Sequence, residues 1–145
     1  MTARPRDELA PGYRLDDQIG FMLRQASQRH TALFVARFGA LTATQWAALA
    51  KLAEVGATSQ NHLGRLTAMD VATINGVIDR LSGKRLVVAT ADRSDARRRL
   101  LDLTPEGRAL VAEMTAAAQE VTRETLAPLS KSESAAFLAL LRKLS

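Results

Sequence analysis

The sequence predicts a mainly α-helical protein with one small β-hairpin. Apolar residues recur at helical spacing through most of the chain, in segments separated by capping residues, glycine and proline. Between residues 86 and 103 the pattern changes to short apolar runs on either side of a polar loop, which is typical of two strands joined by a turn. Two closely spaced short helices precede this hairpin.

Composition limits the possible functions. The 145 residues suit one domain with helical extensions, and an apolar content of 47% is enough for a core. The absence of cysteine excludes a disulfide framework, and the two histidines, His30 and His62, are too few for a convincing metal site, so we expect no metal and no cofactor. No stretch approaches the roughly 20 apolar residues of a membrane span. The expected location is the cytoplasm, with no membrane partner.

The first half of the chain predicts a tail and two helices. Residues 1–13 are polar and interrupted by proline and glycine, so we expect a flexible tail. Residues 14–38 keep a helical apolar stripe that Gly39 ends, and the segment 14–41 is interpreted as a dimerisation helix. The next helix follows the segment LTATQWAALAKLAEVG, with Thr42 or Thr44 as its N-cap and Gly56 as its end.

The middle of the chain predicts a winged helix-turn-helix domain over residues 42–104. A short third helix in TSQNHLGRL has Thr58 or Ser59 as its cap and ends near Met69, and Asp70 caps a fourth helix, VATINGVIDRLSG. Two candidate strands, at residues 86–88 and 99–103, then enclose the charged loop ATADRSDARR. Such a hairpin directly after a helix-turn-helix is a wing.

The end of the chain predicts two further helices, which we assign to dimerisation over residues 105–145. Thr104, Pro105 and Glu106 form a helix start, this helix runs to about Leu126, and Pro128 separates it from a last helix that Ser130 or Ser132 begins. The domain at 42–104 is too small to cover the apolar faces of the terminal helices. We therefore expect a homodimer, whose two reading helices lie about 34 Å apart and match a pseudo-palindromic DNA site.

The positive charge concentrates where a DNA interface is expected. Residues 70–100 carry seven basic and four acidic side chains, and the fourth helix has a small and polar face that can enter a major groove. Asp95 lies close enough to Arg97 to orient its guanidinium, and arginines of the wing can reach the minor groove. A solvated hairpin with a purely structural Asp–Arg pair is the alternative. The predicted DNA contacts are Ser59, Gln60, Thr73, Asn75, Gly76, Arg80, Arg93, Arg97 and Arg98.

Three segments resemble the MarR family of bacterial regulators, over about residues 15–145. They are LTATQWAAL, ATINGVIDRLSGKRLV and DRSDARRRLLDLTPEG, of which the last is similar to the family's wing signature. The resemblance implies wing roles for Asp95 and Arg97, recognition-helix roles for Thr73, Asn75 and Arg80, and dimerisation through the terminal helices. In one departure from the pattern, Arg85 stands where the family often has glycine, and Gly83 lies two residues earlier.

The first helix also offers candidate effector-binding residues. His30 and Arg37 lie on its apolar stripe, where polar groups need partners. They are either satisfied structural residues or part of a pocket beneath the dimer helices that holds an aromatic carboxylate; Trp46 is either core or a wall of that pocket, and His62 can face the first helix or solvent. The predicted ligand-binding set is His30, Phe34, Arg37, Trp46 and His62.

A narrower resemblance concerns the effector. LDDQIGFMLRQASQRHTALFVARF together with TSQNHLGRL is similar to the repressors of nicotinate catabolism, which respond to 6-hydroxynicotinate. It implies a repressor released from DNA by a small aromatic or pyridine carboxylate. Apolar walls would stack on the ring, a cation would hold the carboxylate, and a histidine or an amide would take the ring oxygen.

Other classes of function fit the sequence less well. No carboxylate pair, nucleophile–base pair or glycine-rich phosphate loop indicates an enzyme. A metal- or thiol-sensing regulator conflicts with two histidines and no cysteine. An architectural DNA-binding protein without an effector remains the alternative, and its lack of preference for one palindrome over random DNA distinguishes it.

Overall fold

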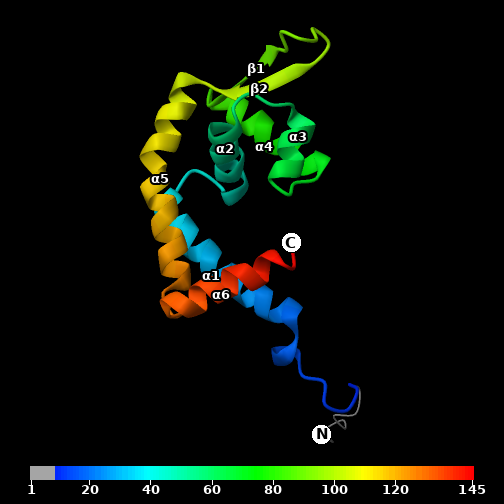
Figure 1. The fold of residues 1–145 in the computed structure, drawn as a ribbon, viewed down its shortest axis with the longest axis vertical. Helices are drawn as coiled ribbons and strands as arrows, with labels where there is room; N and C mark the ends of the chain where they lie inside the picture. Colours follow the sequence, from blue (N-terminus) through cyan, green and yellow to red (C-terminus); the bar gives the residue numbers. More distant parts are fainter. Residues whose placement is uncertain (1–8) are drawn as a thin grey trace, which may run out of the picture.

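The computed structural model describes residues 9–145, so most of the predicted tail lies outside the described residues. The elements in chain order are η1 Leu15–Asp17, α1 Ile19–Phe38, α2 Ala43–Val55, α3 Gln60–Leu66, α4 Val71–Gly83, β1 Val87–Ala91, β2 Arg99–Leu103, α5 Pro105–Leu126 and α6 Lys131–Arg142. Figure 1 shows two ends joined by the long helix α5 along one side. We call α2, α3, α4 and the hairpin of β1 and β2 the head, and η1, α1, α6 and the end of α5 beside them the base.

Side-chain caps set the starts of five helices and decide between the alternatives that the sequence left open. Thr42, not Thr44, begins α2, where its hydroxyl accepts from the Gln45 N–H and the Gln45 side chain accepts from the Thr42 N–H. Ser59 begins α3, and Ser130 begins α6. The predicted caps Asp70 and Thr104 are confirmed at the starts of α4 and α5. These caps satisfy N–H groups that the first helical turn leaves unpaired.

Three predicted boundaries were wrong. The helix expected from residue 14 is split, because Gln18 is extended and separates the short η1 from α1. The third helix ends at Leu66 and not near Met69, since Ala68 has a positive φ of 55° that no helix can continue through. The first strand continues to Ala91, where antiparallel pairing with Arg99 extends it beyond its apolar run.

The hairpin is attached to the head by its inner end. In the antiparallel pair of β1 and β2, Val87 lies opposite Leu103 and Ala91 lies opposite Arg99. Val87, Leu101 and Leu103 are buried; beyond them toward the loop, residues 88–91 and Arg99 are exposed and Leu100 is half-buried. Thr58, just before α3, exchanges two backbone hydrogen bonds with Leu101, of 3.0 and 2.8 Å. The wing therefore has a fixed root and an exposed outer half.

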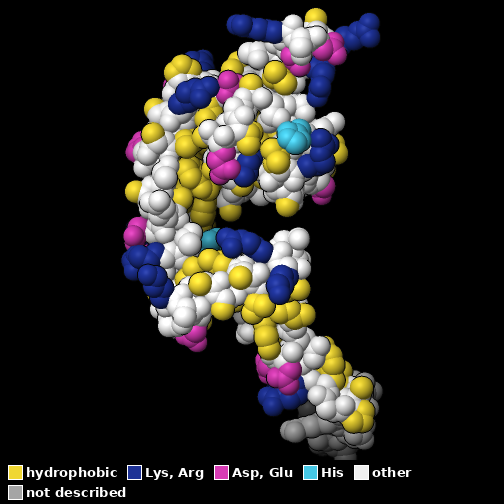
Figure 2. Space-filling view, in the orientation of Figure 1, with side chains coloured by type: hydrophobic (Ala, Val, Ile, Leu, Met, Phe, Trp, Pro, Cys, Tyr) yellow, Lys and Arg dark blue, Asp and Glu magenta, His cyan; other side chains and the backbone are white. Residues whose placement is uncertain are grey.

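One continuous core joins the head to the upper part of the base. Its most deeply buried side chains come from α2, α3 and α4: Leu49, Leu52, Leu63, Ile74 and Leu81. Phe34 and Phe38 of α1 and Val121 of α5 extend this cluster into the base. This packing holds the head on α5 although Figure 2 shows the molecule hollowed between head and base.

The base carries exposed apolar side chains in the single chain. The exposed set, from η1, α1, α6 and the residues after α6, is Leu15, Ile19, Met22, Leu23, Phe137, Leu140 and Leu144. No residue of α6 is buried in the single chain, and Figure 2 shows hydrophobic side chains on this surface. We call this set the basal apolar surface. None of the helices found between residues 9 and 145 has the length and apolar character required to cross a membrane.

Candidate nucleic-acid interface

The helix-turn-helix is a closely packed unit. The backbone N–H of Met69 donates to the Gly64 carbonyl over 2.8 Å and so closes the turn between α3 and α4. A Cβ on Gly64 would lie 3.2 Å from the Met69 carbonyl oxygen and 3.3 Å from Ile74, so glycine permits this approach. The fixed angle between the two helices positions α4 on the surface of the head.

Helix α4 has a buried apolar side and an exposed polar side. Ile74, Val77, Ile78 and Leu81 are buried, as their helical spacing predicts. On the other side, Thr73, Asn75 and Arg80 are exposed and Gly76 is half-buried. The Arg80 guanidinium lies over Gly76, 3.6 Å from the position that a Cβ there would take. The structure therefore brings the four predicted contacts of α4 to one open face.

Asp70 adds negative charge and a cap at the start of this helix. Its carboxylate accepts from the Thr73 N–H over 2.7 Å. Hydrogen bonds from the side chain and the backbone of Thr73 lower the pKa of Asp70 below its ordinary value of 3.8. The ionised carboxylate stabilises the first turn of α4 through its hydrogen bond and through the helix dipole.

The start of α3 lies next to the exposed face of α4. The Ser59 hydroxyl accepts from the His62 N–H over 3.3 Å, so this predicted DNA contact also serves as the helix cap. Gln60, the first residue of α3, donates from its amide Nε2 to the Asn75 side-chain oxygen on α4. Two predicted DNA contacts from different helices are thus joined directly.

Two aspartates order the loop of the wing. The Asp92 carboxylate accepts from the Ser94 N–H over 2.9 Å and from the Ser94 hydroxyl over 2.7 Å, and hydrogen bonds from the side chain and backbone of Ser94 lower the pKa of Asp92. The Asp95 carboxylate accepts from the backbone N–H of Arg97 over 3.0 Å, and not from the guanidinium as expected. Asp95 thereby shapes the turn that presents Arg97. The role of Asp92 was missed, although Asp-x-Ser is a recognisable turn sequence.

The four arginines predicted to contact DNA have no carboxylate partner among the described residues. Within residues 9–145, no carboxylate lies within 4.0 Å of the guanidinium groups of Arg80, Arg93, Arg97 or Arg98, and all four residues are exposed. By contrast, Arg37 and Arg123 of the base pair with Glu124 and Glu120. Lys and Arg side chains gather around the hairpin end of the molecule in Figure 2. The head thus carries cations whose charge is not neutralised by neighbouring side chains.

Of the predicted effector residues, His30 lines a cavity within the base. Its ring Nδ1 lies 2.9 Å from the Thr125 hydroxyl of α5. This cavity, of about 350 Å³, lies between α1, α5 and α6 and has mostly apolar walls. Its lining is Leu23, Ala26, Ser27, His30, Thr122, Thr125, Leu126, Phe137, Leu138 and Leu141.

The other four predicted effector residues lie elsewhere in the single chain. Phe34 is buried in the core and stacks on Phe38 with ring centroids 4.1 Å apart. Trp46 is half-buried, packs against the same Phe38 at 5.1 Å, and lines a different pocket, between α2 and α5. Arg37 is paired with Glu124, and this hydrogen bond raises the pKa of Arg37. His62 lies exposed on α3. One chain therefore does not bring the five predicted residues around one cavity.

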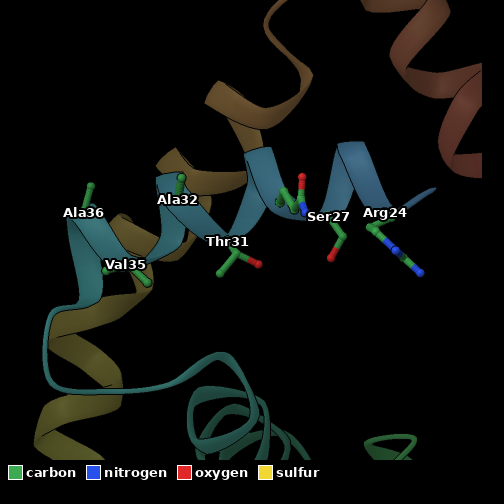
Figure 3. Close-up of a pocket in the computed structure, with 7 residues that line it drawn as sticks. Arg24, Ser27, Thr31, Ala32, Val35 and Ala36 are labelled. Atoms are coloured by element: carbon green, nitrogen blue, oxygen red, sulfur yellow. The ribbon is translucent and has the colours of Figure 1, made fainter. Parts of the chain in front are cut away.

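A second groove follows the outer face of α1 (Figure 3). It is open, has a volume of about 680 Å³, and is lined by Arg24, Ser27, Gln28, Thr31, Ala32, Val35 and Ala36. Ser27 lines both this groove and the cavity that contains His30. Arg24, a cation at the groove, was missed by the sequence analysis, although its spacing from Ser27, Gln28 and Thr31 places all four on one helical face.

The fold and the interface define a winged helix-turn-helix protein of the transcription-regulator class. A family model described as the MarR family matches residues 41–98. The transcriptional repressor NicR of Pseudomonas putida is 37% identical over 134 residues, which cover 91% of this chain and 85% of the repressor. The chain therefore belongs to the MarR family, and its relatives are named as regulators, which agrees with the expectation that it is not an enzyme.

Two solved structures extend this similarity to the whole fold. A probable transcriptional regulator from Pseudomonas aeruginosa superposes with a TM-score of 0.88 at 54% identity, covering 91% of this chain and all of the other. BpsR of Bordetella bronchiseptica, whose DNA binding is regulated by 6-hydroxynicotinic acid, superposes with a TM-score of 0.87 at 41% identity, covering 91% and 96% of the two chains. The predicted fold class and the narrower resemblance to nicotinate-related repressors are both confirmed.

Proposed function

We propose that this chain is a cytoplasmic repressor that binds a pseudo-palindromic operator as a homodimer and leaves the DNA when it binds a small heteroaromatic carboxylate such as 6-hydroxynicotinate. In this proposal α4 enters the major groove and the wing contacts the flanking backbone or minor groove. The basal apolar surface of one chain covers that of the second copy.

The observation that carries the DNA-binding part is the unpaired arginines of the head. A guanidinium without a carboxylate partner can neutralise a DNA phosphate and release its condensed counterion, whereas a paired one must first break its ion pair. Arg80 on α4 and Arg93, Arg97 and Arg98 on the wing are such groups among the described residues, and they lie on the two elements that a winged helix-turn-helix presents to a duplex.

The effector part is supported by His30 and by the relatives. The cavity of about 350 Å³ falls within the size range of small-molecule sites and has apolar walls against which a ring can stack. His30, held by Thr125, offers one polar group there. The DNA binding of BpsR, 41% identical to this chain, is regulated by 6-hydroxynicotinic acid.

The DNA-binding part is tested by titration. DNA selected from a random library is compared with shuffled DNA by fluorescence anisotropy, at several salt concentrations. A repressor prefers the selected palindrome by about 1,000-fold or more, whereas an architectural protein binds both alike. Equal affinity for both DNAs would contradict the proposal.

The effector part is tested on the protein–DNA complex. We expect 6-hydroxynicotinate to release the DNA and to raise the melting temperature of the free protein, and nicotinate, which lacks the ring oxygen, to act more weakly. We expect His30→Ala to keep its DNA affinity and to lose the release. A His30→Ala protein that is released at the same effector concentration as the parent protein would remove His30 from the site.

A further inference from the structure

The hydrogen bond between Gln60 and Asn75 joins the two helices of the reading head at their exposed side. Gln60 is the first residue of α3, and Asn75 lies on the outer face of α4, 15 residues later. The Gln60 Nε2 donates and the Asn75 Oδ1 accepts. Asn75 is exposed and Gln60 is half-buried, so the pair lies at the surface of the head and not in its core.

This bond sets the orientation of the two amide groups. It uses one hydrogen of the Gln60 Nε2 and one acceptor site of the Asn75 Oδ1, and turns these two atoms toward each other. The Asn75 Nδ2, a donor, and the Gln60 Oε1, an acceptor, point away from this bond. Neither Nδ2 of Asn75 nor Oε1 of Gln60 has another hydrogen-bond partner in the part of the chain that the structure describes. An isolated Asn75 amide could rotate and present either end, whereas the paired one presents its donor.

The pair is not needed to hold α3 against α4. Leu63 and Ile74 are fully buried between these helices, and the Met69 N–H bond to the Gly64 carbonyl closes the turn. A surface hydrogen bond between two amides adds little to such packing. The effect of the Gln60–Asn75 bond therefore falls on the orientation of the two side chains.

We propose that Gln60 and Asn75 act as one reading unit for adenine, with Gln60 as the positioning and specificity-determining partner of Asn75. In the major groove adenine presents the acceptor N7 beside the donor N6, and the donor of Asn75 with the acceptor of Gln60 is complementary to that edge. The proposal rests on the proposed function, because it requires α4 to lie in the major groove of the operator.

The test compares base preferences position by position. The operator is first selected from random DNA with the parent protein, and affinities are then measured for every single-base substitution in one half-site. The proteins are the parent, Gln60→Ala, Asn75→Ala and the double variant. Asn61→Ala, which changes an exposed neighbouring amide on α3, is the matched control.

We expect the parent protein to prefer adenine at one position of each half-site by at least about fivefold. Gln60→Ala and Asn75→Ala each lose this preference and keep those at the other positions. The double variant loses no more than either single variant, because the two residues act as a unit. Asn61→Ala keeps the full pattern.

A Gln60→Glu variant makes the test sharper. A carboxylate can only accept, so Asn75 must turn its Nδ2 toward residue 60 and present its Oδ1 to the groove, and the adenine preference is lost. Retained adenine preference in Gln60→Ala, or an equal loss of affinity at every position, would overturn this proposal alone. A parent protein that selects no sequence at all would overturn the proposed function together with it.

Discussion

At the scale of single residues, Gly107 shows how closely the start of α5 is packed. A Cβ at this position would lie 2.2 Å from the carbonyl oxygen of Leu86. The same carbonyl accepts from the Thr104 N–H over 3.0 Å, and the Thr104 hydroxyl accepts from the Gly107 N–H over 3.0 Å. The glycine in the segment Leu-Thr-Pro-Glu-Gly is therefore required by the contact of α5 with the backbone between α4 and β1.

We predict that Gly107→Ala lowers the free energy of unfolding by about 2 to 3 kcal/mol, because the new methyl group meets backbone that cannot move aside. Gly83→Ala is the matched control, since nothing lies within 4 Å of a Cβ at that helical position. There we expect no loss, because alanine is the better helix former. Urea unfolding followed by circular dichroism measures both, and similar stabilities of the two variants would contradict the prediction.

A second prediction for a single residue concerns Asp70 and the pH dependence of the folded protein's stability. Its pKa is lower in the folded than in the unfolded chain because of its hydrogen bonds with Thr73. The stability it contributes is therefore fully present above its ordinary pKa of 3.8 and is lost as the pH falls through the lower folded value. Asp70→Asn keeps a capping oxygen and does not titrate.

The measurement is the difference in urea midpoint between the parent protein and Asp70→Asn, followed from neutral pH to below 3.8. We expect a constant difference at the upper end and a shift in favour of the variant at the lower end. Carboxylates common to both proteins cancel in this difference. A difference that does not change with pH would show that Asp70 contributes nothing through its charge.

At the scale of elements, the sequence predicted helices and strands well and their ends less well. Long apolar periodicities and capping residues located the helices, because both signals are local. The choice of Thr42 over Thr44 had a local signal, the capping box with Gln45 three residues later. The choice between Thr58 and Ser59 involves a tertiary contact, because Thr58 is engaged with Leu101 of β2. Such a pairing between distant segments has no local signature.

Arg85, which stands where the family often has glycine, also has an unusual backbone conformation. Arg85, two residues after the end of α4, has a φ of 59°, in the left-handed region that favours glycine. The sequence comparison with the family's pattern located this position correctly as unusual. The chain keeps the turn and accepts the strain of a side chain there, and the Arg85 carbonyl is tied by the Thr104 hydroxyl over 2.7 Å.

For the wing we predict an effect on the salt dependence of DNA binding. Removing one phosphate-contacting cation lowers the slope of log affinity against log salt concentration by about 0.9. We expect this of Arg97→Ala, whose guanidinium lacks a carboxylate partner within the described chain. Arg123→Ala is the control, because Arg123 is paired with Glu120 in the base. An unchanged slope for Arg97→Ala would exclude Arg97 from phosphate contact.

At the scale of the whole molecule, side-chain bonds tie α1 to α5, and one further bond ties the segment after α1 to the residue after α4. Arg29 of α1 donates to the Glu124 carbonyl near the end of α5 over 2.8 Å, and Arg37 pairs with the Glu124 carboxylate. Lys84, after α4, donates to the Ala40 carbonyl between α1 and α2 over 3.2 Å. A ligand that moves α1 relative to α5 would therefore act on the bonds of α1 with Glu124, and through Ala40 on the bond with Lys84, next to α4.

The same scale explains why the predicted DNA contacts lie together in the structure and the predicted effector residues do not. The predicted DNA contacts lie on three elements that follow one another in the sequence, namely the start of α3, α4 and the wing, and these elements pack together in the head. The effector residues were taken from one stripe of α1 and from the head, and packing directs Phe34 into the core and Trp46 against it, while Arg37 turns to α5. Which side chains share a cavity depends on how distant helices, and a second copy, pack against one another.

The basal apolar surface gives the last prediction. Leu140 on α6 is 59% exposed in the single chain, and covering such side chains by a second copy removes apolar surface from water. Leu140→Asp would place a charge in that interface, so we expect a monomer whose head stays folded. Because the operator has two half-sites, its affinity then falls about 100-fold or more, whereas weak binding to random DNA remains.

Val55→Asp is the matched control, since Val55 is 48% exposed at the end of α2 in the head. Light scattering after size exclusion gives the mass of each variant, circular dichroism reports the helices, and anisotropy gives the DNA affinities. We expect Val55→Asp to remain a dimer and to keep its operator affinity, because a charge on an already hydrated surface costs little. A dimeric Leu140→Asp with parental operator affinity would mean that α6 does not join the two copies, and that another surface sets the distance between the two reading helices.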